Sequence, residues 1–328
     1  MTYLPQIRIL VPSAQVSSYT TGSFNLPSQK ETFIAPVGTR GLTAGGDTGS
    51  SSNVIDYVDI ATTGNAVDFG DLTAARASLC VGSVASTTRG LFVGGYTNTT
   101  TNIIDYVTIL TTGNATDFGD LTAVVLQGGA HSSRTRGLRM GGNGNLSSID
   151  YVTIAATGNA TSFGTLTLAR ASHSVGSSTR AIAIGGSDNV GTPVNNIDYV
   201  EIATLGNATD FGDVVRYAGN CGTASSNTRG VIQAGFLYST SAIGTSMDYI
   251  TIASTGNSTT FGEGTISRQN QCGTGTNTRG IFMGGRTGYI NTIDYITIAS
   301  TGNATDFGDL TQSTNAPGAT SNGHGGLN

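Results

Sequence analysis

The stretch TRGIFMGGRTGYINTIDYITIASTGNATDFGDLT, residues 278–311, decides the fold because close copies of it occur six times in the 328 residues. Each copy has an arginine that follows a threonine, and successive arginines are 49, 47, 44, 49 and 50 residues apart. A period in this range is typical of proteins that repeat one supersecondary unit. The arginines that set the register are Arg40, Arg89, Arg136, Arg180, Arg229 and Arg279.

Three other landmarks recur along the repeats. The apolar run after the arginine ends in a double glycine, except in the fifth copy, which has Ala234 and Gly235. A Gly-Asn pair and a phenylalanine close each unit, as at Gly302, Asn303 and Phe307. Between these landmarks lies an Asp-Tyr pair, whose aspartates are Asp56, Asp105, Asp150, Asp198, Asp248 and Asp294.

Each copy is predicted to form four antiparallel β-strands. Glycine before asparagine suits a type II′ hairpin turn, so the Asp-Tyr strand and the following strand with phenylalanine should be neighbours. The double glycine ends another strand, where positive φ angles are expected, and a further strand lies upstream, as in residues 170–175. Both faces of the Asp-Tyr strand are largely apolar, so each small sheet must pack between two others. We therefore expect an all-β fold, a six-bladed β-propeller with almost no helix.

The order of these motifs resembles the kelch repeat. Kelch units also have a strand with arginine, an apolar strand that ends in Gly-Gly, a strand with a tyrosine and aspartate pair, and a strand with an aromatic residue. The resemblance covers roughly residues 29–311, and it implies a kelch-like propeller. Two features depart from it: the pair runs Asp-Tyr where kelch units usually have Tyr-Asp, and phenylalanine replaces tryptophan, which this chain lacks.

The repeats divide the chain into three parts. Residues 29–311 are expected to be the propeller, with blades at about 29–74, 75–122, 123–167, 168–215, 216–265 and 266–311. Residues 1–28 lie outside the repeats and are expected either to complete the ring as a strand or to dock as an arm onto another subunit. Residues 312–328 begin like another unit, and we expect them to start as a closing strand and then to fray.

The composition of the chain bears on whether the protein binds nucleic acid, enters a membrane or contains disulfides. The net charge is −5, only 11% of residues are charged, and Lys30 is the one lysine, so nucleic acid is not favoured as a partner. No apolar stretch reaches the roughly 18 residues of a membrane span, and no signal peptide is recognised, so we expect no membrane insertion. The odd number of cysteines argues against a disulfide framework.

The loop between the second strand and the Asp-Tyr pair varies from copy to copy, whereas the Gly-Asn turn does not. In a four-stranded antiparallel blade the second-to-third and fourth-to-first connections lie on one face of the ring, so one face is variable and the other uniform. Variable loops on a rigid scaffold often carry recognition, although repeats also drift freely where nothing is packed. The candidate binding residues on these loops are Tyr96, Asn98, Asn143, Asn145, Asp188, Asn189, Leu237, Tyr238, Arg286 and Tyr289.

The recurrent arginines and aspartates are expected to be structural. Each arginine should bind a carboxylate or a carbonyl in its own blade or in the next one. The acidic motif of the last strand, as at Asp306 and Asp309, offers oxygen ligands for Ca²⁺, but hydrogen bonding in turns is the simpler role. We predict no metal and no cofactor.

The few residues that do not recur are the candidates for catalytic groups. Three cysteines and two histidines fall on the predicted first strands of successive blades, and a soft metal site would need them to converge. Their offsets differ, so buried structural roles are expected, and no arrangement typical of a hydrolase or nucleotide-binding enzyme stands apart from the repeat. The residues are Cys80, His131, His173, Cys221 and Cys272.

Tandem units of this kind also look like those of kelch-like proteins in tailed bacteriophages, especially phages of marine bacteria. That resemblance implies a non-enzymatic structural or adhesion protein of the virion, such as a tail fibre or a head or tail decoration. Its expected partners are other virion proteins, bound through the N-terminal arm in a multi-subunit assembly, and a host glycan or protein. Two alternatives remain open: a secreted or surface lectin-like propeller, and a propeller enzyme.

Overall fold

A computed structural model of the chain describes residues 38–144, 146–188, 190–216 and 218–327. The segment 1–28, for which an arm or a ring-closing strand is predicted, lies outside these residues.

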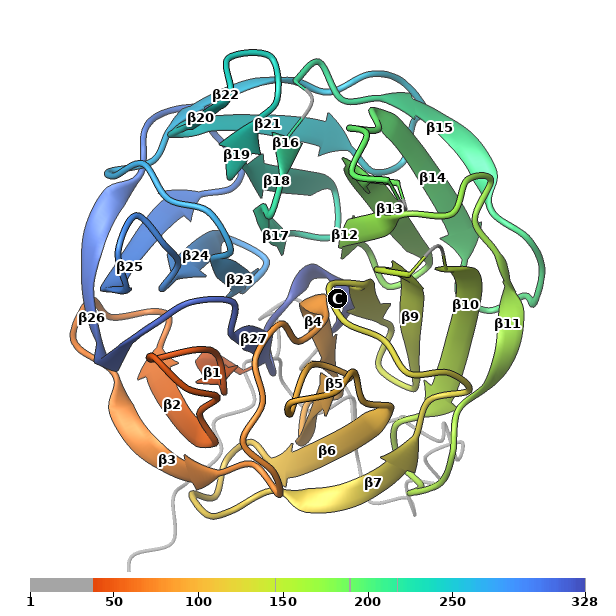
Figure 1. Cartoon of the computed structure of the whole chain (residues 1–328). Helices are drawn as coiled ribbons and strands as arrows, with labels where there is room; N and C mark the ends of the chain where they lie inside the picture. The colour runs from red at the N-terminus through yellow and green to blue at the C-terminus, as the bar shows by residue number, and fades with distance from the viewer. Residues whose placement is uncertain (1–37, 145, 189, 217, 328) are drawn as a thin grey trace, which may run out of the picture. The chain divides into compact units, whose positions relative to one another are not determined.

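Four kinds of strand recur from the axis of the structure to its rim (Figure 1). The innermost strands are β27 (Gly318–Ser321), β4 (Val81–Ala85), β8 (Gly129–Ser132), β12 (Ala171–Gly176), β17 (Gly222–Ser225) and β23 (Cys272–Gly275). The second strands are β1 (Arg40–Ala44), β5 (Arg89–Val93), β9 (Arg136–Gly142), β13 (Arg180–Ser187), β18 (Arg229–Gln233) and β24 (Arg279–Met283).

The remaining strands complete each repeat toward the rim. The third strands are β2 (Val54–Asp59), β6 (Ile103–Thr108), β10 (Leu146–Thr153), β14 (Asn196–Glu201), β21 (Ser246–Thr251) and β25 (Ile290–Thr297). The outermost strands are β3 (Val67–Asp71), β7 (Thr116–Asp120), β11 (Thr161–Thr165), β15 (Thr209–Asp213), β22 (Thr259–Glu263) and β26 (Thr305–Thr314). The fifth repeat adds a small sheet of β16 (Ala218–Gly219), β19 (Phe236–Leu237) and β20 (Ala242–Ile243).

These strands form an all-β, propeller-like ring of antiparallel sheets. Four sheets are separate and have four strands each, in the orders β27-β1-β2-β3, β12-β13-β14-β15, β17-β18-β21-β22 and β23-β24-β25-β26. The prediction that the Asp-Tyr strand pairs antiparallel with the phenylalanine strand is confirmed, as for Tyr295 and Thr305.

The sequence predicts six separate blades, but the hydrogen bonds between strands do not separate the repeats into six sheets. The second and third repeats share one eight-stranded sheet, β11-β10-β9-β8-β4-β5-β6-β7, because β4 and β8 pair in parallel. Gly82 makes this approach possible, since a Cβ atom at that position would lie 1.9 Å from the carbonyl oxygen of Ala130. The inner strands of two repeats thus come within hydrogen-bonding reach near the axis.

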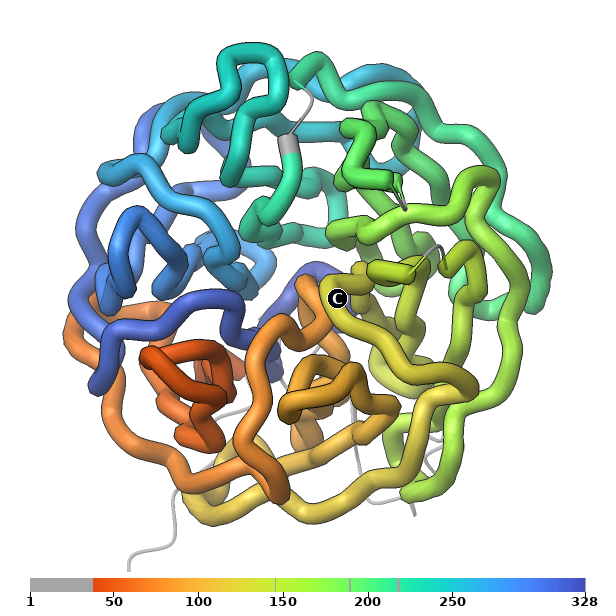
Figure 2. The backbone as a smooth tube through the Cα atoms, in the orientation of Figure 1, coloured from red at the N-terminus to blue at the C-terminus, as the bar shows by residue number. Residues whose placement is uncertain are grey.

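The end of the chain joins its beginning. Strand β27 pairs antiparallel with β1, with Ala319 opposite Thr43, so the last strand belongs to the sheet of the first repeat. Figure 2 shows this C-terminal segment running inward beside the first repeat. The residues after β27 do not project as the expected frayed end, because Asn322–Leu327 are buried and include a short 3₁₀ helix, η1 (Gly325–Leu327).

The apolar core lies between the repeats. The described residues contain six buried apolar clusters, and each draws its side chains from two neighbouring repeats. One of them joins Ile60 of the first repeat to Ile281 and Phe307 of the sixth. Each sheet therefore buries both faces, as the apolar third strand predicts.

The Gly-Asn pair is not the predicted two-residue hairpin turn. It lies in a longer connection that reaches sideways and binds the outermost strand of the preceding repeat. Gly302 N donates to Phe261 O at 2.9 Å, Ala304 N donates to Glu263 O at 2.8 Å, and the side chain of Asn303 accepts from Glu263 N. The same three bonds occur at all six junctions, including the one from Gly64 and Asn65 back to the sixth repeat.

We expect Gly262→Ala to destabilise the protein by about 3 kcal/mol, because overpacking and the loss of hydrogen bonds combine. A Cβ atom at Gly262 would lie 2.1 Å from the carbonyl oxygen of Gly302, so the two repeats would have to move apart. Gly302→Ala is the matched control, since a Cβ atom there meets nothing within 4 Å. Urea unfolding of both variants checks this; equal stabilities would refute the close contact.

Candidate functional site

The six arginines that follow threonine connect each repeat to the next. Each guanidinium lies over the tyrosine ring of its own repeat, with its central carbon 4.2 to 4.7 Å from the ring centroid. The tyrosine meets the phenylalanine of the repeat edge to face. In every repeat the guanidinium also donates to an isoleucine carbonyl of the following repeat, as from Arg180 to Ile252 at 2.9 Å. We expected each of these arginines to bind either a carboxylate or a carbonyl, and a carbonyl partner is present at all six junctions.

The aspartates of the Asp-Tyr pairs are buried, and five of them bind a threonine hydroxyl of the preceding repeat. Thr167, for example, donates to Asp198 at 2.7 Å. Five carboxylates also form ion pairs with a second set of arginines. These pairs are Arg76 with Asp105, Arg139 with Asp150, Arg170 with Asp198, Arg216 with Asp248 and Arg268 with Asp294.

This second set of arginines was missed in the sequence. Arg76, Arg170 and Arg268 share a place shortly after the outermost strand, which is a recurrence that the sequence offers. Arg216 lies in the same connection but closer to the end of the strand, and Arg139 lies on the second strand, so spacing alone does not reveal these two. Asp56 forms no ion pair with an arginine among the described residues. Burial raises the pKa of its carboxyl above 3.8, although the hydrogen bonds from Thr311 act to lower this pKa.

Half of the predicted binding residues lie exposed on the loops between second and third strands. Tyr96 and Tyr289 are 43% and 45% exposed, and Asn98, Asn143 and Arg286 are also exposed. The side chains of these five residues are open to solvent.

The other predicted binding residues are used within the protein or lie outside the described part. Asp188 accepts hydrogen bonds from backbone amides of its own loop. Leu237 packs against the core between the fourth and fifth repeats, and Tyr238 meets a neighbouring phenylalanine edge to face. Asn145 and Asn189 fall outside the described residues.

Two contacts join the variable loops of adjacent repeats. The hydroxyl of Tyr289 in the sixth repeat donates to Asp47 in the first at 3.2 Å, and Ser51 in the first donates to the carbonyl of Tyr96 in the second. These four residues form a surface that spans three repeats, which we call the tyrosine patch. It is the part of the variable face where exposed aromatic side chains and loop contacts coincide.

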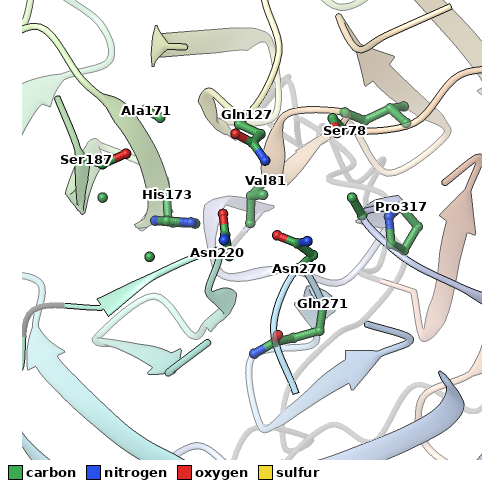
Figure 3. Close-up of a pocket in the computed structure, with 14 residues that line it drawn as sticks. Ser78, Val81, Gln127, Ala171, His173, Ser187, Asn220, Asn270, Gln271 and Pro317 are labelled. Atoms are coloured by element: carbon green, nitrogen blue, oxygen red, sulfur yellow. The ribbon is translucent and has the colours of Figure 1, made fainter. Parts of the chain in front are cut away.

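A small polar cavity lies at the axis, at the ends of the sheets that carry the variable loops (Figure 3). Its volume of about 30 Å³ leaves room for about two water molecules. Four polar residues that line it come just before the inner strands: Ser78, Gln127, Asn220 and Asn270. Gln271, the residue after Asn270, also belongs to the lining. None of these residues was predicted as part of a site.

Five residues around this cavity share a left-handed backbone conformation that residues other than glycine rarely adopt. Ser78, Gln127, Asn220, Asn270 and Ala316 have φ angles between 54° and 57°. Their backbones are joined in series around the axis: Asn270 donates to Asn220, Ala316 to Asn270, Ser78 to Ala316 and Gln127 to Ser78, over 2.8 to 3.1 Å. Because the residue types differ from repeat to repeat, the sequence pattern gives no sign of this series of hydrogen bonds.

The fourth repeat contributes an imidazole to the cavity wall. The register of β12 with β13 shifts between Ala171 and His173, and Nε2 of His173 accepts a hydrogen bond from the amide of Cys221 at 3.0 Å. Accepting this bond requires Nε2 without a proton, so the ring is neutral. Burial is the main cause that lowers the pKa of His173 to about 4.

The other histidines and the cysteines are buried as well. His131 meets His324 of the C-terminal tail edge to face, with ring centroids 5.6 Å apart. The three cysteines are free thiols, and burial raises the pKa of Cys80 to about 11 and that of Cys221 and Cys272 to about 12. In the part of the chain that the structure describes, no group of three or more His, Cys, Asp or Glu residues is placed to hold a metal ion.

Because its histidines are buried, we expect acid to destabilise the folded protein. Burial lowers the pKa of both His131 and His173 from 6.5 to about 4. Between these pH values the unfolded chain binds protons that the folded chain does not, so the free energy of unfolding should fall as pH falls, by up to about 1.4 kcal/mol per pH unit for each histidine. Urea unfolding between pH 7 and 4 measures this; His173→Gln should have a shallower pH dependence, and an unchanged slope would contradict the assignment.

No protein-family model matches the chain, and no curated protein matches it. Among the residues that the structure describes, no helix has the length and apolar character needed to span a membrane. The class that the structure establishes is an all-β repeat protein with a propeller-like ring of antiparallel sheets.

Proposed function

We propose that the ring is a kelch-like β-propeller in which each of the six sequence repeats is one blade. The eight-stranded sheet supports this division, because it contains two sets of four strands in the order found in the separate sheets. On this interpretation the parallel contact of β4 and β8 is an added link between two blades. The same sideways Gly-Asn bonds at six junctions support a count of six.

For the function, we propose a non-enzymatic structural or adhesion module of a virion surface that presents the tyrosine patch to a host glycan or protein. The observation that carries this proposal is the contrast between the two groups of polar side chains. The recurrent arginines and aspartates are engaged in bonds between or within repeats, whereas Tyr96 and Tyr289 stay exposed on the variable loops. Tyrosine supplies a large contact area at low entropic cost, which suits recognition.

We expect the double substitution of Tyr96 and Tyr289 by alanine to weaken binding to a bacterial surface glycan at least about tenfold, since exposed tyrosines are frequent anchors of interfaces. The measurement is binding of the purified full-length protein to an array of bacterial surface polysaccharides. Leu110→Ala is the matched control, because Leu110 is 61% exposed but lies on the connection that carries the uniform Gly-Asn segment. Equal loss in both proteins would refute the patch, and absence of wild-type binding would refute glycan adhesion.

The location is tested separately by a cryo-EM map of the particle. The proposal expects density for the ring on the virion surface with its variable loops facing outward. A ring that is attached through these loops, with the Gly-Asn face outward, would contradict it.

A further inference from the structure

The charge of Arg286 has no partner within the part of the protein that the structure describes. Each of the other described arginines has an interaction partner, such as the isoleucine carbonyls and the aspartates named above. The exposed guanidinium of Arg286 takes part in none of the ion pairs between the described residues. It is also the one positive charge on the described loops between second and third strands.

The backbone of Arg286 is fixed, although its guanidinium is not. Its amide donates to Gln269 O at 2.7 Å, and its carbonyl accepts from Gln269 N at 3.2 Å. Arg286 also lies directly opposite Tyr289 in an antiparallel bridge. Side chains of directly opposite residues stand on the same side of the strand pair, with Cβ atoms about 5 Å apart. The guanidinium and the phenol ring therefore leave the loop together.

Asp47 of the first repeat holds the other end of the phenol. Its Oδ2 accepts the hydroxyl of Tyr289 at 3.2 Å, and its Oδ1 accepts the amide of Gly49 at 2.9 Å. Both carboxylate oxygens thus have donors, and Asp47 is in no ion pair with Arg286 among the described residues. The loops after β24, β1 and β5 lie on consecutive repeats (Figure 1), so Arg286 borders the tyrosine patch.

We propose that Arg286 and the tyrosine patch bind an acidic polysaccharide, with a sugar carboxylate or phosphate on the guanidinium and sugar rings against Tyr96 and Tyr289. The planar guanidinium offers paired N–H donors that match the oxygens of either anion. The exposed tyrosines supply contact area beside that charge. This inference rests on the proposed recognition by the tyrosine patch, and it names the class of glycan.

An array of bacterial surface polysaccharides in neutral, uronate-bearing and phosphate-bearing groups tests the class with the full-length protein. Binding to one of the acidic groups is expected, and it should weaken as the salt concentration rises. Uronate-bearing members identify the carboxylate as the anion, and phosphate-bearing members identify the phosphate. Binding confined to neutral polysaccharides overturns this inference but leaves glycan adhesion standing, whereas no binding at all refutes both.

A chemically matched probe isolates the role of the anion. Reduction of the carboxylates of a bound uronate polysaccharide to alcohols leaves the chain of sugars intact and should weaken binding at least about tenfold, as the loss of a charged hydrogen-bond pair predicts. The same treatment should not change the binding of a phosphate polysaccharide without uronate. Unchanged binding of the reduced uronate polysaccharide would show that its charge is not recognised, which contradicts the proposal.

Two charge variants should have opposite effects on binding to the acidic polysaccharide. Arg286→Gln should weaken it roughly tenfold and flatten its salt dependence, because the paired donors and the charge are lost. Asp47→Asn should strengthen it by about threefold, because a negative charge beside the anion is removed. Asp188→Asn is the matched control, since it changes the net charge equally but lies on the loop of the fourth repeat, and its binding should not change.

Thermal melting establishes that the variants are folded before their affinities are compared. The proposal is wrong if folded Arg286→Gln binds the acidic polysaccharide as tightly as the wild type. It is also wrong if Asp47→Asn and Asp188→Asn strengthen binding equally, because net charge alone would then explain the effect.

Discussion

Removal of residues 318–328 is expected to reduce the free energy of unfolding by more than about 5 kcal/mol, which is a large part of the stability of a typical domain. The truncation deletes β27, the strand that pairs with β1, and leaves the inner edge of the first sheet without partners. It also removes buried Ala319 and Leu327 from the interior. Differential scanning calorimetry should record a melting temperature lowered by well over 10 °C, or no cooperative transition.

A peptide of residues 318–328 added in trans provides the control for this truncation. Strand addition to an exposed sheet edge is a common mode of peptide binding, so the peptide should restore the transition in a concentration-dependent manner. A truncated chain that melts like the full-length protein would show that β27 does not complete the first sheet.

Arg170→Ala is expected to cost about 3–5 kcal/mol, because removal of one partner from a buried ion pair leaves the other charge without compensation. Arg170 and Asp198 are both 0% exposed and lie 2.9 Å apart. The guanidinium also donates to the carbonyls of Gly185, Leu168 and Ala183, which would lose a donor as well. Chemical denaturation gives the change directly.

Glu201→Ala is the control for the effect of burial. Its pair with Arg180 has the same separation of 2.9 Å, but the glutamate side chain is 48% exposed, so its loss should cost less than about 1 kcal/mol. The double variant Arg170→Met with Asp198→Asn should recover part of the loss, because no buried charge remains unpaired. Equal costs for Arg170→Ala and Glu201→Ala would contradict the structural role of the buried pair.

The general arrangement of strands follows from the sequence because the repeat unit cannot bury both of its apolar faces alone. The strand positions around Asp294 and Phe307 were recognisable from β-forming residues between glycine signals. The prediction of positive φ at the double glycine is confirmed, with 64° at Gly284 and 113° at Gly285. In these cases the local chemistry and the tertiary structure require the same conformation.

Other features depend on neighbours that a single repeat does not contain. The Gly-Asn pair fits a hairpin turn locally, but the outermost strand of the adjacent repeat offers three hydrogen bonds and determines its position instead. Arg139 replaces the arginine of other repeats from the second strand instead of from the connection after the outermost strand, because only the position of the guanidinium matters to the carboxylate. The axial cavity arises from residues of several repeats, and its left-handed backbone carries no consistent residue type. The site was therefore harder to predict than the fold.

Hydrogen exchange of the Gly64 amide tests most directly whether the repeats form a closed ring. This amide donates to Phe307 O at 2.9 Å across the junction between the first and sixth repeats. Gly113, Gly158, Gly206, Gly256 and Gly302 make the same bond at the other five junctions. A closed ring predicts that NMR exchange shows Gly64 protected to the same degree as these five glycines; exchange of Gly64 at the rate of an unprotected amide, with the other five still protected, would show an open array.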